Sequence, residues 1–77
     1  MKTDDFIELI VDGLEIENII VTPDTIFDSL AEWDSMGAMI IIGLVAEHFD
    51  ITLKGKDIAQ LTTIKSLIEK IGTDRFS

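Results

Sequence analysis

The sequence predicts an all-α fold, a small four-helix bundle with three longer helices, one short helix and a long first loop. Apolar residues recur at three- and four-residue spacing over 3–14 and 64–71, as they do along one face of a helix. Residues 36–46 carry no charge and extend the apolar character to nearly every face of a third helical segment. Short helices with a shared apolar face bury it best as a bundle. A chain of 77 residues is expected to form a single domain over 1–77.

The first helix is expected over 3–14, with Thr3 as its N-cap and with acids in its first turn, which suits the helix dipole. Gly13 is expected to fray its end. The apolar stripe of this helix consists of the following residues: Phe6, Leu9 or Ile10, and Leu14.

Residues 15–27 are expected to form a long loop. Ile19-Ile20-Val21 has strand propensity but no clear partner strand, and Thr22-Pro23-Asp24 interrupts it, so we predict that these apolar residues anchor the loop to the core. Ser29 and Glu32 have the spacing of a capping box, which predicts a single helical turn that ends at Trp33-Asp34.

The second long helix is predicted from Ser35 to about Phe49, a length of about 21 Å, with Asp34 or Ser35 as its cap. A helix that is apolar on nearly every face cannot be wholly buried in so small a domain, so it presents part of its surface to a partner. We expect this exposed apolar surface near the N-terminal end, drawn from the following residues: Met36, Met39, Ile40 and Ile42.

The C-terminal part is expected to contain a loop over 50–55 with Ile51 and Leu53 as apolar anchors, followed by a short helix within 56–61. Thr62-Thr63 is predicted to cap the last helix, 64–71.

The residues predicted to face inward from that last helix are Ile64, Leu67, Ile68 and Ile71. Gly72 is expected to end the helix with a left-handed residue, and 73–77 to form a loose tail.

The net charge of −9 lies entirely at or before residue 36, where ten acids and one base give −9, while five acids and five bases cancel over 37–77. Acidic surface argues against nucleic-acid partners. It either speeds encounter with basic protein surfaces or only provides solubility. We expect no signal peptide, because the N-terminus is acidic, and the longest apolar run is too short for a membrane span, so the expected location is the cytoplasm.

The sequence offers no set of residues for enzymatic chemistry. It has no cysteine and no tyrosine, and its single histidine, His48, has no second histidine with which to form a metal site. On one helix His48 lies roughly 20 Å from Ser35, which excludes a serine–histidine pair. We therefore expect neither an enzyme nor a metal site.

Ser35 is the candidate functional residue because it stands at a helix start, beside Asp34 and before an apolar surface. A helix N-terminus favours a phosphate, since free backbone N–H groups and the helix dipole point there. Ser35 is thus either a simple N-cap or the site of a phosphodiester.

Three motifs stand at fixed spacing: Asp34-Ser35-Met36, then Glu47-His48-Phe49 with Phe49 fourteen residues after the serine, and then Leu61-Thr62-Thr63-Ile64. In these motifs the chain closely resembles the acyl carrier proteins. The resemblance covers almost the whole chain. The family motif reads Asp-Ser-Leu at the start of the second helix, which ends in Glu-x-Phe. Asp28-Ser29-Leu30 matches the tripeptide better, but its interval to Phe49 breaks the family spacing.

The resemblance implies that Ser35 carries 4′-phosphopantetheine, which a phosphopantetheinyl transferase installs from coenzyme A. The thiol of this arm would hold an acyl or aminoacyl group as a thioester, in exchange with an acyl-loading ligase or synthase and acyl-accepting enzymes. The leading interpretation is a monomeric, specialised acyl carrier protein in fatty-acid, lipid, cell-envelope or secondary-metabolite synthesis. The alternatives are a stand-alone aminoacyl, peptidyl or aryl carrier, and an unmodified helical protein-interaction module.

The sequence departs from the family in its charges. Glu47 is the only acid of the predicted second helix, and 54–58 is basic where the family is usually acidic. This favours a dedicated partner enzyme. We expect the partner to dock on an uncharged surface with an acidic rim. The surface comprises Met36, Met39, Ile40 and Gly43, and the rim comprises Asp28, Glu32 and Asp34.

Overall fold

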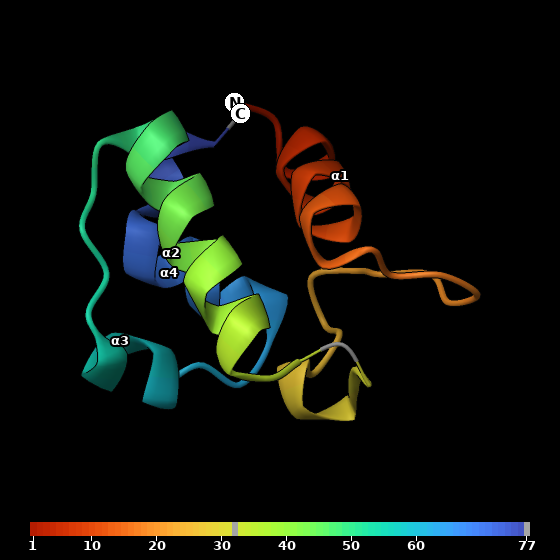
Figure 1. Cartoon of the computed structure of the whole chain (residues 1–77). Coiled ribbons are helices and arrows are strands. Elements are labelled where there is room, and N and C mark those ends of the chain that lie inside the picture. The colour runs from red at the N-terminus through yellow and green to blue at the C-terminus, as the bar shows by residue number, and fades with distance from the viewer. Residues whose placement is uncertain (32, 77) are drawn as a thin grey trace.

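In residues 1–31 and 33–76, which the computed structural model describes, the chain forms four α-helices and two 3₁₀ turns and no strand. Their bounds in chain order are α1 Thr3–Leu14, η1 Phe27–Ser29, α2 Ser35–Phe49, α3 Gly55–Ala59, α4 Ile64–Ile71 and η2 Thr73–Arg75. Figure 1 shows α2 crossing in front of α4, with α1 to one side, α3 at the opposite edge and the two termini close together. The prediction of an all-α bundle with three longer helices and one short helix is confirmed.

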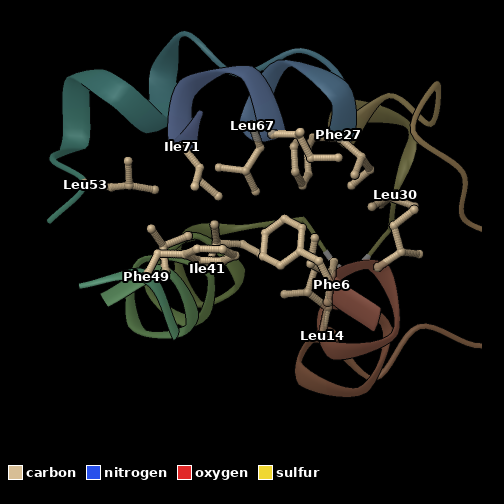
Figure 2. Close-up of a cluster of buried hydrophobic side chains, with 14 of the residues drawn as sticks. Phe6, Leu14, Phe27, Leu30, Ile41, Phe49, Leu53, Leu67 and Ile71 are labelled. Carbon is tan, nitrogen blue, oxygen red and sulfur yellow. The ribbon is translucent and has the colours of Figure 1, made fainter. Parts of the chain in front are cut away.

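One apolar core lies between α1, α2 and α4, and Phe6 and Phe27 are completely buried in it. Phe6 of α1 meets Phe49 of α2 edge to face, with ring centroids 5.5 Å apart, an arrangement that stabilises beyond simple burial. Figure 2 shows residues of α4, η1 and the 50–54 segment facing those of α1 and α2 across this core. Leu53 is buried, as predicted, and so is the whole predicted stripe of α4: Ile64, Leu67, Ile68 and Ile71.

Two predictions about α1 are wrong. The helix begins at Thr3, and the N-cap position belongs to Lys2, whose side chain makes no capping hydrogen bond. Gly13 does not fray the end, because it lies where α1 packs on α2. A Cβ atom there would lie 3.0 Å from Ile40 Cγ2 and 3.4 Å from Leu44 Cδ1, so glycine permits the close approach of the two helices.

The first loop is anchored differently from the prediction. Ile19 and Ile20 are 51% and 89% exposed, while Ile16 is buried and Val21 packs against the core. Asn18 has a positive φ of 68°, which marks a turn in this segment, and Figure 1 shows the loop extending away from the bundle after α1.

The later part of the loop is fixed by backbone hydrogen bonds to the chain around the start of α4. Phe27 N donates to Thr62 O at 2.9 Å, and Ile64 N donates to Thr25 O at 3.1 Å. Lys65 N also donates to Pro23 O at 2.8 Å. Side-chain polarity carries no information about such bonds, which explains why the apolar residues were a poor guide to the anchor points.

The single helical turn also lies earlier than predicted, at Phe27–Ser29. The Ser29 hydroxyl donates to Ile26 O at 2.6 Å, so it closes this turn from within. The predicted capping box with Glu32 lies outside the described residues.

The short helix α3 begins at Gly55, one residue before the predicted start, and ends at Ala59, two residues before the predicted end. Asp57 fixes its first turn, because its Oδ2 accepts from Lys54 N at 2.9 Å. This hydrogen bond lowers the pKa of the Asp57 carboxyl from its usual value, and the nearby Lys70 ammonium, 3.5 Å away, acts in the same direction.

The prediction of a loose tail is wrong for residues 73–76, which the structure describes. Residues 73–75 form η2. The ring of Phe76 then packs against the rings of Phe6 and Phe49, with a distance of 5.3 Å between ring centroids in each pair. Arg75 Nη1 donates to Phe49 O at 3.0 Å. Gly72 ends α4 as predicted, but with φ 118° and ψ 117° it lies outside the left-handed helical region.

Candidate functional site

Ser35 is exposed and is the first residue of α2, as predicted. The preceding residue, Asp34, has extended backbone angles and caps the helix: its Oδ1 accepts from Gly37 N at 2.8 Å. Asp34 O also accepts the first helical bond, from Ala38 N at 2.9 Å. The sequence left Asp34 and Ser35 as alternative caps. The structure gives this role to Asp34, so the Ser35 hydroxyl is not needed to cap α2.

A phosphate ester on Ser35 fits the electrostatics of this helix end. The first backbone N–H groups of an α-helix have no partner within the helix, and the dipole is positive there. Residues 35–38 include no acid, and the Asp34 carboxylate is held towards Gly37 N. An anion at Ser35 is therefore placed where the helix favours it.

Ser29, the other serine that follows an aspartate, has a different setting. It is exposed, but it ends a three-residue 3₁₀ turn and its hydroxyl donates to Ile26 O. No long helix begins at Ser29, since α2 starts six residues later. Of the two serines, only Ser35 therefore has a long helix whose dipole can stabilise a phosphate.

An exposed apolar surface adjoins Ser35 on α2. Met36 and Met39 are each 71% exposed, and an added Cβ at the exposed Gly43 would meet nothing within 4 Å. Ile40 is half-buried, because one side of it packs against Gly13. The structure thus brings the four predicted docking residues together on one helix. We call Met36, Met39 and Gly43 the methionine face.

The predicted acidic rim is partly described. Asp28 is exposed on η1, and Asp34 is exposed at the start of α2. Glu32 lies outside the described residues. His48 is exposed at the other end of α2, in its last turn, where a basic residue suits the helix dipole.

A groove that sequence reasoning missed lies between the end of α1 and the start of α2. It has a volume of about 230 Å³, and its lining includes Gly13 and Glu15 from the α1 side and Asp34, Met36 and Ile40 from the α2 side. Neither Gly13 nor Glu15 was predicted to be near Ser35, because their proximity depends on how α1 packs on α2. A second hollow, of about 370 Å³, is lined by none of the predicted site residues; its lining is Gln60, Leu61, Ser66, Glu69 and Lys70.

Replacing Asp34 by alanine is expected to destabilise the domain by about 1 kcal/mol, because α2 loses the side chain that caps it. In a domain of this size that corresponds to a fall in Tm of about 4–8 °C, measurable by circular dichroism. Asp34→Asn is the control, since asparagine caps equally well. An unchanged Tm for Asp34→Ala would show that the cap contributes nothing.

Within 1–31 and 33–76 the structure contains no group of three or more His, Asp or Glu residues placed to hold a metal ion. Among the helices within these described residues, none is long and apolar enough to cross a membrane.

Comparison with known proteins gives one family. The family model described as "phosphopantetheine attachment site" matches residues 4–71, which is most of the chain. No curated protein and no solved structure gives a significant match.

Proposed function

The chain belongs to the phosphopantetheine-attachment family and so provides the site for covalent 4′-phosphopantetheine. We propose that Ser35 is the residue that holds this group and that the chain is a discrete acyl carrier protein. The observation that carries the proposal is the division of roles at the start of α2. Asp34 caps the helix, while the exposed Ser35 hydroxyl stands at its positive end. The phosphate of the arm would lie where the backbone N–H groups favour an anion.

In the proposed modification, the Ser35 hydroxyl oxygen bonds to phosphorus of coenzyme A within the active site of a phosphopantetheinyl transferase. The bond between the two bridged phosphates of coenzyme A breaks, adenosine 3′,5′-bisphosphate leaves, and the hydroxyl proton passes to a base of the transferase. The attached group supplies a thiol on a flexible arm, which a chain without cysteine does not otherwise have.

We propose that the chain carries cargo for other enzymes and catalyses no step itself, as domains of this family generally do. Its partners would be the transferase, a loading ligase or synthase, and an acyl-accepting enzyme. The second candidate cargo is an aminoacyl, peptidyl or aryl group. For either cargo the charges of the chain favour a dedicated loading enzyme, because Glu47 is the only acid on α2, and Lys54 and Lys56 flank the start of α3.

Intact-mass measurement tests the attachment. Incubation with coenzyme A and a broad-specificity phosphopantetheinyl transferase is expected to add one phosphopantetheinyl group to each chain. No added mass would overturn both carrier proposals and favour an unmodified helical interaction module instead.

We propose further that the loading enzyme docks on the methionine face together with Ile40, with Asp28 and Asp34 on the rim. Met39→Glu is expected to lower the rate of loading about tenfold, because it places a charge in an apolar contact, a loss of about 1.4 kcal/mol. Glu47→Ala should change the rate less, since Glu47 lies near the far end of α2. A larger loss for Glu47→Ala than for Met39→Glu would contradict this docking mode.

A further inference from the structure

The recognition surface around Ser35 has its apolar residues and its acids on different helices. The solvent-facing side of α2 carries the methionine face and no acid until Glu47. Glu47 lies twelve residues after Ser35, which is about 18 Å along the helix. Electrostatic attraction of an enzyme to Ser35 must therefore come from acids outside α2.

The acids of α1 lie on one stripe. Asp5, Glu8, Asp12 and Glu15 follow at intervals of three, four and three residues, and all four are exposed. Such intervals place side chains on one face of a helix. Glu15, the residue that follows α1, has a left-handed conformation with φ 54°, and it lines the groove beside Asp34 and Met36.

The packing of α1 determines which way this stripe faces. The buried Ile10 marks the core side of α1, and Gly13, against Ile40 and Leu44, marks the side that meets α2. At 100° per residue, Asp12 lies about 100° from Gly13 and about 160° from Ile10 around α1, so it faces solvent. Glu15 lines the groove at the end of the α1–α2 contact, beside Asp34 and Met36.

The groove between the two helices joins these elements into one surface. Its lining combines the carboxylates of Glu15 and Asp34 with the apolar side chains of Met36 and Ile40. Gly13 lets α1 and α2 approach closely beside the groove, because a Cβ atom at this position would lie 3.0 Å from Ile40 Cγ2. The chemistry is that of a site for an apolar side chain flanked by basic residues.

We propose that the phosphopantetheinyl transferase docks on this α1–α2 surface, with α1 supplying the acids that α2 lacks; this inference rests on the proposed function of Ser35. The transferase must hold coenzyme A, which carries three phosphate groups, so its surface near the incoming serine is basic. The segment up to residue 36 carries a charge of −9, which attracts such a surface. The segment 37–77, which includes α3 and α4, has no net charge, so α3 and α4 offer a basic partner no comparable attraction.

Charge reversal on α1 tests the proposal against a matched pair elsewhere. Asp12→Lys/Glu15→Lys is expected to lower kcat/KM for arm transfer from coenzyme A about tenfold at low ionic strength, mainly through a higher KM. Glu69→Lys/Asp74→Lys makes the same change in net charge at exposed positions of α4 and η2, and it should change kcat/KM less than twofold. Added salt should narrow the gap between the two variants.

A binding measurement separates docking from chemistry and from folding. The Ser35→Ala chain, labelled with ¹⁵N and titrated with the transferase, is expected to show chemical-shift changes at residues 12–15 and 36–40, with smaller ones at 55–71. Circular dichroism should show that both double variants stay helical.

Each outcome bears on one of the two proposals. Equal losses for the two double variants, or shift changes concentrated on α3 and α4, would overturn the α1–α2 surface while leaving Ser35 as the attachment site. If the wild-type chain takes no arm, the proposed function fails. The titration then still decides whether the transferase binds this surface, and an absence of shift changes at 12–15 and 36–40 would overturn the inference.

Discussion

Replacing Ser35 by alanine is expected to abolish the addition of phosphopantetheine completely, since the substitution removes the oxygen atom that would form the phosphodiester. The loss should not reflect unfolding. Asp34, and not Ser35, caps α2, and alanine is the best helix former. We expect the stability to change by less than about 0.5 kcal/mol, as for most exposed positions.

Ser29→Ala is the matched control, because it removes the same atom from the other Asp-Ser pair. This variant should take up one arm at the wild-type rate, although the loss of the bond to Ile26 O weakens the turn at 27–29. Intact mass before and after incubation with coenzyme A and transferase reads out both variants, and fragmentation of the modified chain locates the arm. Uptake by Ser35→Ala, or loss of uptake in Ser29→Ala, would contradict the assignment of Ser35.

Replacing Phe6 by alanine is expected to unfold most of the chain at 25 °C. Phe6 is fully buried, and its ring contacts those of Phe49 and Phe76, with centroids 5.5 Å and 5.3 Å away. Truncation of a buried phenylalanine costs about 3–5 kcal/mol. A domain of this size has a total stability of about 3–5 kcal/mol from its core, so the expected loss equals most of it.

Urea unfolding followed by circular dichroism measures this effect. Ile20→Ala is the control, because Ile20 is also a large apolar residue but is 89% exposed, so its truncation should change the stability by less than about 0.5 kcal/mol. A cooperative transition for Phe6→Ala within 1 kcal/mol of the wild type would show that the three-ring cluster does not hold α1 to the bundle.

Local signals in the sequence predicted the helices well. The bounds of α1, α2 and α4 agree with those predicted. Apolar spacing sets the extent of a helix, and a capping side chain such as Asp34 or Thr63 sets its start. Both signals act over a few residues, although the cap signal failed at α1, where Lys2 and not Thr3 holds the N-cap position.

The fate of individual apolar residues was less predictable. Ile20 and Phe76 are both apolar residues in irregular segments, yet Ile20 is exposed and Phe76 packs on two rings of the core. The difference depends on backbone bonds and contacts between segments that lie far apart along the chain. Phe76, for instance, is seventy residues from Phe6.

The candidate site also has one part that the sequence predicts and another part that depends on how the helices pack. Ser35, its neighbouring acid and the exposed apolar residues behind it follow from the sequence, because they lie within one helix and its cap. The capping bond of Asp34 is also local, although the sequence did not decide between Asp34 and Ser35. Only the tertiary structure brought Gly13 and Glu15 to the groove beside Met36. Periodicity fixes which residues share a face of one helix, whereas the packing of α1 on α2 decides which faces of two helices meet.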